Sequence, residues 1–432
     1  MRDLLPTDKR RRERILSLIR EVYAEHGFDE IETPAMEDSE RLHSGMGGDN
    51  EKLSYAVMRR GLEQGDLQAA AESGDPLDLS DLGLRFDLTV PLSRFIATNR
   101  GSLPGIFRSL QIGPVWRAER PQKGRYRQFV QCDVDISGDE SELAEIELLL
   151  AASDAFTRLG LDAVRLRVND RRLLDGVLEA CGFGEDARPG VLITIDKLDK
   201  IGTDGVLGEL RERHGSESEA AIAVLADALE AWSPVVGGGV EVTDASMREI
   251  LPGQIAEHER VGEALESLAA IAAGYREAGG RLPLDFDPTL VRGMGYYTGT
   301  IIEAAHPASG SSVGGGGRYD GMIGRFLGQD VPAAGFSIGF ERIVDLIDDE
   351  AIAPEGERRA IALLVDKRLS AADAARVKTA WMQPGSRVRI ERRPKNVRGL
   401  IERLGDEGFT HIGYVRDEHL GDPRSITLEP LD

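Results

Sequence analysis

Two segments of the sequence place acidic residues at the alternating spacing of a strand face. In residues 84–90 a period of two assigns one face to Arg85, Asp87 and Thr89. In residues 129–136 the same period assigns one face to Gln131, Asp133 and Asp135. Aspartate is disfavoured in strands, so two on one face need water or a cationic partner. A solvated sheet face is the simple alternative; if both faces line one cleft, the aspartates form an acidic floor suited to an ammonium group.

A cationic segment follows the first of these stretches. Residues 117–127 hold five basic residues and one acid, with Pro121 and Gly124 at a bend, which indicates a hairpin loop. Arginines that flank a turn can hold phosphate through bidentate hydrogen bonds. A surface loop with scattered, solvated arginines is the alternative.

Two later segments combine arginine with glycine. In residues 290–300 Arg292 precedes a glycine turn and a pair of tyrosines at a strand start, which form either a core pair or a contact to a polar ligand. Arg342 follows the glycine-rich run 335–339 where a strand passes into a helix, so it either stacks on a base or forms a salt bridge. The glycine runs match neither the phosphate loop of ordinary ATPases nor the dinucleotide fingerprint of dehydrogenases.

Together and in this order, these segments resemble the histidyl-tRNA synthetases, a family of class II aminoacyl-tRNA synthetases. The runs that carry the resemblance are 120–129, 290–299, 316–321 and 335–342, and it extends over nearly the whole chain. The resemblance implies an α+β fold: a class II synthetase-like antiparallel sheet with surrounding helices, a helical insertion, and a small C-terminal α/β domain that binds the anticodon. It also implies a homodimer, formed partly through the first helix and the strand that ends at Pro34.

The resemblance further implies that histidine is activated with ATP and Mg²⁺ and then transferred to the 3′ end of its tRNA. By the family pattern, the amino group of histidine is held by Asp87, Thr89 and Gln131. Its imidazole meets Asp135 and Tyr297, with Tyr319 nearby.

The nucleotide contacts carried over from the family are mostly arginines. Arg117 is expected at the α-phosphate, Glu119 at the adenine side, Arg125 at the outer phosphates and Arg342 stacked on adenine. Arg292 is the arginine particular to this family that stabilises charge during adenylation. No metal site formed by protein side chains is expected.

Two alternatives remain beside a histidine-tRNA ligase. A regulatory, histidine-binding paralogue that controls ATP phosphoribosyltransferase usually lacks the C-terminal domain and several catalytic arginines, whereas Arg117, Arg292 and Arg342 are all present here. A histidine-activating paralogue with a non-tRNA acceptor stays open, because the last domain matches the family less closely than the core does.

The elements that must position these residues follow from the periodicity. A helical stripe predicts a helix over residues 8–26 that Gly27 ends, and residues 30–34 indicate a short strand in which Pro34 requires either a sheet edge or a strand end. A helix over 140–160 and a strand over 163–169 follow, and residues 284–346 return to strands and glycine-rich turns.

The domain boundaries follow changes in this pattern. We expect a catalytic core in two parts, 1–184 and 284–352, separated by an acidic helical insertion over 185–283. A linker over 353–357 leads to a domain over 358–432, in which strands and helices alternate as in a small α/β sandwich.

Composition limits the partners and the compartment. The 53 Lys and Arg against 75 Asp and Glu give a net charge of −22, so contact with nucleic acid requires a local basic patch. Residues 387–403 supply one, with seven basic and two acidic side chains. Two cysteines suit a reducing cytoplasm, and the absence of a signal core or a long apolar run predicts a chain that is neither secreted nor membrane-spanning.

Overall fold

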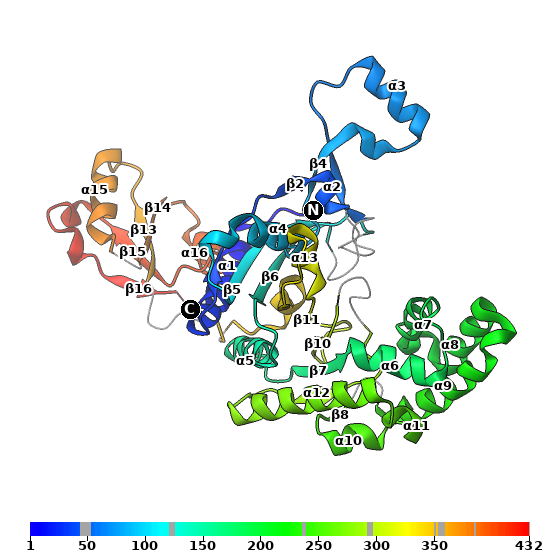
Figure 1. Ribbon diagram of the computed structural model, residues 1–432. Coiled ribbons are helices and arrows are strands. Elements are labelled where there is room, and N and C mark those ends of the chain that lie inside the picture. The colour runs from blue at the N-terminus through cyan, green and yellow to red at the C-terminus, as the bar shows by residue number, and fades with distance from the viewer. Residues whose placement is uncertain are drawn as a thin grey trace. The chain divides into compact units, whose positions relative to one another are not determined.

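A nine-stranded mixed sheet organises the larger of the two units into which the chain divides (Figure 1). This unit comprises Met1–Arg2 and Ile15–Ala351, and the smaller unit comprises Asp3–Arg14 and Ile352–Asp432. The computed structural model describes residues 1–43, 53–120, 126–235, 239–291, 297–349, 351–352, 359–383 and 386–431. None of the helices in these ranges is long and apolar enough to cross a membrane.

The strands of the large sheet lie in an order far from their order in the chain. From one edge to the other they are β1 (Asp29–Glu30), β5 (Phe107–Trp116), β6 (Gln128–Ser137), β12 (Ala333–Gly339), β11 (Gly314–Arg318), β10 (Thr300–Ala305), β7 (Arg165–Asp170), β9 (Leu284–Phe286) and β8 (Val240–Glu241). All neighbours from β5 to β7 are antiparallel, whereas β1 runs parallel to β5 and β9 parallel to β7. The antiparallel centre therefore joins segments from both halves of the chain.

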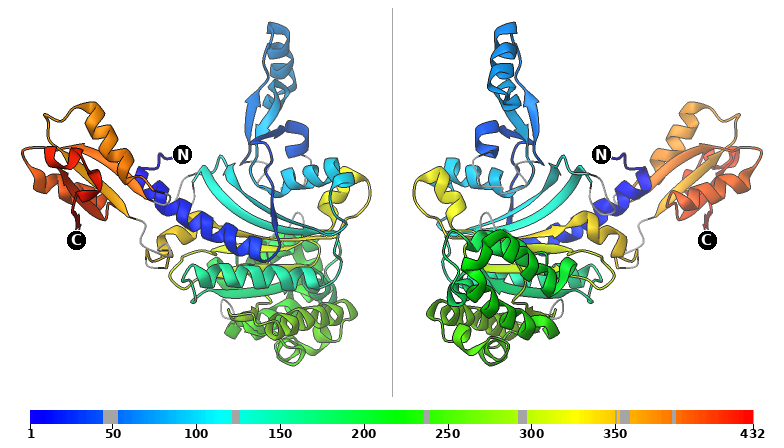
Figure 2. Two further views of the ribbon diagram at one scale, coloured as in Figure 1. Left: turned by 90° about the vertical axis from the view of Figure 1, so that its left-hand side faces the viewer. Right: turned by 90° about the vertical axis from the view of Figure 1, so that its right-hand side faces the viewer.

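Helices α1 (Pro6–Glu25) and α5 (Leu143–Arg158) cover the apolar face of the central strands (Figure 2). The α1 stripe is buried at Ile15, Ile19 and Tyr23, and Gly27 follows the helix with a left-handed φ of 82°. On α5, the Phe156 ring meets Phe336 of β12 edge-on at 6.3 Å. The helices predicted over 8–26 and 140–160 and the strand predicted over 163–169 are thereby confirmed.

The opposite face of the sheet carries α4 (Thr89–Asn99) and α13 (Gly321–Leu327). An apolar cluster joins them to the sheet; its buried members are Leu42, Phe86, Val90, Leu92, Ile96, Phe107, Tyr319, Met322, Ile323 and Ala333. This cluster fixes the two helix N-termini beside the polar side chains of the central strands.

The strand predicted over 84–90 is wrong beyond its first residue. Strand β4 (Ser80–Leu84) ends there, the chain turns, and α4 begins at Thr89. The Asp87 carboxylate accepts a hydrogen bond from the Val90 N–H at 3.1 Å, and Pro91 cannot donate to a strand ladder. A local cap at a helix start thus displaces the extended conformation that simple alternation suggested.

The glycine run 314–317, expected among glycine-rich turns, instead forms the central strand β11. Its partners approach so closely that side chains have no room, because a Cβ on Gly316 would lie 2.0 Å from the Gly335 carbonyl oxygen of β12. Gly317 also has a left-handed φ of 155°. The run is therefore a packing requirement of the sheet.

The edge strand predicted over 30–34 is shorter than expected. Only Asp29 and Glu30 pair with β5, and the Ile31 N–H adds one hydrogen bond to the Leu110 carbonyl at 2.9 Å. Its edge position is confirmed, since β1 has one neighbour among the described strands, and the exposed Pro34 follows the paired residues.

The remaining elements of the larger unit are a small sheet and a group of helices. The sheet has the order β2 (Met36–Asp38), β4, β3 (Tyr55–Met58), with α2 (Ser39–Leu42) and α3 (Gln64–Ser73) beside it. The helices between β7 and β9 are α6 (Arg171–Cys181), α7 (Arg188–Ile195), α8 (Leu198–His214), α9 (Glu219–Trp232), α10 (Asp244–Glu249), α11 (Gly253–Ala256) and α12 (Glu259–Glu277). A short helix, α14 (Phe340–Ile343), follows β12.

The smaller unit has the alternating strands and helices that its sequence predicts. Its sheet has the order β14 (Arg387–Arg392), β13 (Ala360–Val365), β15 (His411–Val415), β16 (Leu428–Pro430), flanked by α15 (Ala371–Trp381) and α16 (Val397–Asp406). The sequence did not predict β16, which adds antiparallel to β15. The linker predicted over 353–357 lies outside the described residues.

Candidate active site

A row of polar or very small side chains crosses the central strands on one face of the large sheet. The register pairs Asp135 of β6 with Gly335 of β12, and Asp133 with Ser337. On the other side of β6, Asp133 pairs with Gln111 of β5. Directly paired residues of antiparallel strands share a face, so the predicted face of Gln131, Asp133 and Asp135 is extended by both neighbouring strands.

Glycines keep this face hollow. A Cβ on Gly335 would lie 2.0 Å from the Asp135 Oδ1 atom, and one on Gly317 would lie 3.1 Å from the ring of Tyr297. The absence of a side chain at Gly335 therefore gives the Asp135 carboxylate its place above the sheet.

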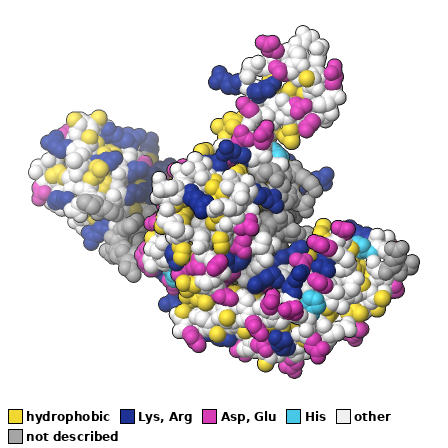
Figure 3. Space-filling view, viewed as in Figure 1, with side chains coloured by type: hydrophobic (Ala, Val, Ile, Leu, Met, Phe, Trp, Pro, Cys, Tyr) yellow, Lys and Arg dark blue, Asp and Glu magenta, His cyan; other side chains and the backbone are white. Residues whose placement is uncertain are grey.

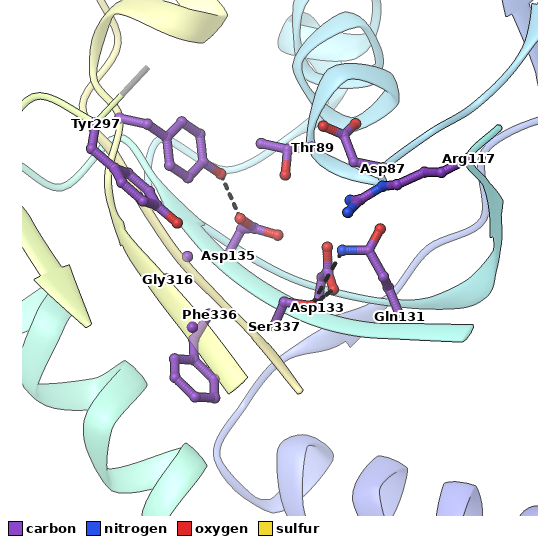
Figure 4. A pocket seen from close by; sticks show the side chains of 13 residues that line it. Asp87, Thr89, Arg117, Gln131, Asp133, Asp135, Tyr297, Gly316, Phe336 and Ser337 are labelled. Atoms are coloured by element: carbon purple, nitrogen blue, oxygen red, sulfur yellow. Dashed lines mark hydrogen bonds between the residues drawn. The ribbon is translucent and has the colours of Figure 1, made fainter. Parts of the chain in front are cut away.

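The hollow is a pocket in which most of the predicted site residues meet (Figure 4). It is lined by Asp87, Thr89, Arg117, Gln131, Asp133, Asp135, Tyr297, Gly315, Gly316, Tyr319, Gly335, Phe336 and Ser337. In Figure 4, Tyr297 lies at one end and Arg117 with Gln131 at the other, with Asp135 between them. The pocket thus has an aromatic end and a cationic end.

Asp135 lies at the centre of the pocket floor, and its carboxylate is hydrogen-bonded to Tyr319. The Tyr319 hydroxyl donates to its Oδ1 at 2.5 Å, and the carboxylate is almost fully buried. Burial, together with the negative charge of Asp87, raises the pKa of Asp135 to about 7, against the opposing effect of the Tyr319 hydrogen bond. The Asp135 carboxyl therefore changes its protonation state near neutral pH.

Asp133 lies two residues earlier on the same face. It accepts a hydrogen bond from the Ser337 hydroxyl at 2.5 Å, and the Gln131 amide donates to that hydroxyl at 3.3 Å. Burial, followed by the negative charge of Asp135, raises the pKa of Asp133 well above its usual range. Three carboxylates crowded in one pocket make it strongly receptive to a cationic group.

The turn before α4 brings Asp87 and Thr89 over this floor. The Arg117 Nε atom donates to the Phe86 carbonyl at 2.9 Å, and its guanidinium lies over the Phe129 ring at 5.0 Å. Arg117 is thereby held beside Asp87 with a cationic group facing the pocket. One end of the pocket can accept an anion while its floor accepts a cation.

The predicted hairpin after Arg117 is confirmed at its base. The last paired residues of β5 and β6 are Trp116 and Gln128, and the Arg117 N–H donates to the Arg127 carbonyl at 2.9 Å. Glu119 lies on this hairpin, half-buried and outside the pocket lining. Arg125 lies outside the described residues.

Arg342 lies in α14, at the junction of strand and helix where the sequence predicts it. It donates to the backbone carbonyl of Ser312 at 2.6 Å and to the Ser312 hydroxyl at 3.1 Å, and it does not line the pocket. Arg292, together with residues 293–296, lies outside the described residues.

Sequence reasoning missed Ser337 and the glycines of the pocket wall. Within β12, alternation assigns Gly335, Ser337 and Gly339 to one face after Ala333, and a strand face with no large apolar side chain signals a cleft. The sequence contains that signal, but it does not show that β12 pairs with β6, so it cannot predict that this face adjoins Asp133 and Asp135.

Comparisons with known proteins agree with one another. A family model described as "Histidyl-tRNA synthetase" matches residues 1–343. The chain is 54% identical over 417 residues to the histidine–tRNA ligase of Leifsonia xyli, covering 96% of this chain and 94% of that protein. It is 41% identical over 349 residues to the histidine–tRNA ligase of Aeropyrum pernix, covering 80% and 72%.

Two solved structures share the fold. The histidyl-tRNA synthetase of Nostoc superposes with a TM-score of 0.75 at 24% identity, covering 100% of this chain and 93% of that one. A Bacillus halodurans protein described as an ATP phosphoribosyltransferase regulatory subunit/histidyl-tRNA synthetase superposes with a TM-score of 0.72 at 20% identity, covering 96% of each chain. The predicted α+β fold of class II synthetase type is confirmed.

Proposed function

Because the chain belongs to the histidyl-tRNA synthetase family, we propose that it is a histidine–tRNA ligase, which activates histidine with ATP and transfers it to the 3′ end of tRNA. The observation that carries this proposal is the pocket itself, where a floor of three aspartates meets one arginine at the cationic end. An amino acid with a cationic amino group and a nucleotide phosphate can bind there side by side.

The histidine contacts follow from the ends of the pocket. We propose that Asp87, Thr89 and Gln131 hold the amino group, since they lie toward the end that holds Arg117. The imidazole points toward Asp135 and Tyr297, and Tyr319 fixes the Asp135 carboxylate through its hydroxyl. The polar floor rejects aliphatic amino acids, because these would offer the buried Asp135 carboxylate no hydrogen-bond donor in addition to Tyr319.

The nucleotide contacts are proposed from the same arrangement and from the family pattern. Arg117 contacts the α-phosphate, since its guanidinium is held at the pocket end. Glu119 and Arg342 lie on the adenine side, Arg125 contacts the outer phosphates, and Arg292 stabilises charge during adenylation. Mg²⁺ enters bound to the phosphate oxygens of ATP, as part of the substrate.

The chemistry of the first step needs alignment more than acid–base catalysis. The histidine carboxylate is already a nucleophile, so its in-line attack on the α-phosphorus forms the adenylate and expels pyrophosphate without a general base. Arg117 stabilises the added negative charge on the α-phosphate in the transition state. A terminal ribose hydroxyl of tRNA then attacks the carbonyl carbon, and AMP leaves.

We propose that the smaller unit binds the anticodon region of tRNA. Five basic side chains of its β14–α16 segment are exposed: Arg392, Arg393, Lys395, Arg398 and Arg403. Figure 3 shows Lys and Arg side chains spread over the visible face of this unit. An exposed cationic surface on an acidic protein binds phosphates selectively, and its affinity should fall steeply with salt.

Assembly and compartment are likewise proposals. The edge strand β1, followed by the exposed Pro34 and Met36, is available to a second copy of the chain, which supports a homodimer. Cys132 and Cys181 are buried free thiols, as expected in the cytoplasm. The regulatory alternative is not favoured, because the identity to a ligase reaches 54% over 96% of the chain.

One assay tests the proposed function directly. The purified chain is incubated with ATP, Mg²⁺, purified histidine tRNA and each of the twenty amino acids in turn. We expect histidine-dependent exchange of pyrophosphate into ATP and charging of the tRNA with histidine alone. Exchange without charging would favour a paralogue with a different acceptor, and no exchange at all would refute the proposal.

The raised pKa of Asp135 predicts that this carboxylate lowers the stability of the fold at high pH while it serves histidine binding. A carboxyl whose folded-state pKa is raised to about 7 stabilises the fold fully at pH values below its unfolded pKa, and this stability is lost as pH rises through 7. Asp135→Asn removes that dependence. Its thermal midpoint should exceed that of the wild type by about 3 °C or more at pH 8, with a smaller difference at pH 5.

The same Asn variant should lose histidine-dependent exchange, by about 100-fold or more in kcat/KM, because a neutral amide cannot balance a charged or strongly polarised imidazole. Thermal scans at the two pH values and exchange kinetics check both parts. An Asn variant that is less stable than the wild type at pH 8 would contradict the conclusion that the buried Asp135 carboxylate destabilises the fold when it is charged.

A further inference from the structure

Gln111 lies in the polar row of the sheet but does not line the pocket. It is in β5, directly opposite Asp133 of β6, and is only 2% exposed. Its amide Nε2 donates to the Leu88 carbonyl at 3.2 Å, and its Oε1 accepts from the Thr33 hydroxyl at 3.1 Å. A buried amide with both ends bonded to fixed partners holds those partners at a set separation.

The Leu88 carbonyl belongs to the turn that carries two pocket residues. Asp87 precedes it and Thr89 follows it, so a shift of this carbonyl moves both side chains that are proposed to hold the amino group of histidine. The turn is held from β5 and the segment after it, since the Trp116 N–H donates to the Arg85 carbonyl at 3.0 Å and Arg117 donates to the Phe86 carbonyl at 2.9 Å. At the Leu88 end, the carbonyl accepts from the Leu92 N–H of α4 at 3.0 Å and from Gln111, so Gln111 links the start of α4 to β5.

Thr33 determines which way the Gln111 amide points. Its hydroxyl donates to Oε1, so the NH₂ group must face Leu88. Arg85 in turn fixes the direction in which the Thr33 hydroxyl donates. The Arg85 Nη1 atom donates to the Thr33 carbonyl at 2.7 Å and to the Thr33 hydroxyl oxygen at 3.2 Å. Both Thr33 and Arg85 are buried, at 3% and 5% exposure, so no solvent competes for these bonds.

We propose that Gln111, oriented by Thr33, is a positioning residue for the amino-group end of the histidine site. It acts through the Leu88 carbonyl and touches no substrate atom. This inference rests on the proposed function, because the ligand whose affinity it sets is histidine. Its loss allows the Asp87–Thr89 turn to move while the rest of the pocket keeps its shape.

The test uses side chains of matched size in the full-length chain. Gln111→Met keeps the length but cannot donate, and we expect the KM for histidine in pyrophosphate exchange to rise about 10-fold, with the KM for ATP changed less than 2-fold. Thr33→Val, which removes the hydroxyl that orients the amide, should raise the KM for histidine about 3-fold. Thr33→Ser, which keeps the hydroxyl, should restore the wild-type value.

The controls separate positioning from general stability. Gln128→Met changes an exposed glutamine of β6 whose Oε1 accepts from the Trp116 indole at 3.2 Å, and it should leave both KM values unchanged. The proposal would be overturned if Gln111→Met and Thr33→Val left the KM for histidine unchanged. It would also be overturned if they raised the KM for ATP as much as the KM for histidine. If the wild type itself shows no histidine-dependent exchange, the proposed function fails, and the inference fails with it.

Discussion

Gly335→Ala is expected to abolish histidine activation while leaving the protein folded. A Cβ at this position would lie 2.0 Å from the Asp135 Oδ1 atom and 2.9 Å from its Cγ, and the nearest backbone atom, the Val134 carbonyl oxygen, would lie at 3.2 Å. The severe overlap involves the end of a side chain, which can turn away, whereas the backbone contact needs only a small adjustment. The strain is therefore relieved at the site and spares the sheet.

Turning the Asp135 carboxylate away breaks its hydrogen bond with Tyr319. It also moves the carboxylate out of reach of the proposed imidazole position. We expect kcat/KM for histidine to fall by at least about 100-fold, with the KM for ATP changed several-fold at most. Pyrophosphate exchange at varied histidine and ATP gives both values, and circular dichroism reports the fold.

Gly208→Ala is the matched control, since Gly208 lies in α8 and a Cβ there has no atom within 4 Å. It should leave exchange unchanged and slightly stabilise the helix. Near wild-type histidine kinetics in Gly335→Ala would show that the Asp135 carboxylate is not needed at its present position.

Arg117→Ala should produce the other large loss. Arg117 lines the cationic end of the pocket, and its Nε–H also holds the Phe86 carbonyl of the turn that carries Asp87. Its removal takes away a charge beside the reacting phosphate and loosens that turn, so we expect the exchange rate to fall by about 10²–10³-fold. Steady-state exchange at saturating histidine measures the effect.

Two variants sharpen this result. Arg117→Lys keeps the charge but lacks the planar donor set, so its rate should lie between those of Arg117→Ala and the wild type. Arg120→Ala removes an exposed arginine of the same hairpin and should change the rate less than 2-fold. If Arg117→Ala kept a tenth or more of the wild-type rate, the role at the α-phosphate would be contradicted.

The sequence predicted the parts of the fold that local periodicity determines. The stripe of α1, the alternation of β6 and the α/β order of the smaller unit each depend on residues within a few positions of one another. For the same reason the shared face of Gln131, Asp133 and Asp135 was predicted correctly.

Two parts of the fold that the sequence did not predict have different causes: in one a local side-chain hydrogen bond competes with the strand, and the other depends on a distant partner. Residues 84–90 alternate as a strand does, but the Asp87 carboxylate accepts a hydrogen bond from the Val90 N–H, which favours a helix start instead. The glycine run of β11 is a strand because β12 lies against it. Local pattern shows which side chains share a face, while the pairing of strands decides what that face meets.

The pocket is closed by contacts between segments that are synthesised far apart in time. The Tyr319 hydroxyl and Asp135 are 184 positions apart, and Ser337 and Asp133 are 204 apart. A nascent chain that has not yet reached Tyr319 therefore has the carboxylates but neither the β12 wall nor the hydroxyls that hold them, and cannot select histidine. Loop-closure entropy makes such long-range pairing slow, so enzymatic competence should emerge only late in translation, as a single step once the second half of the core has been made.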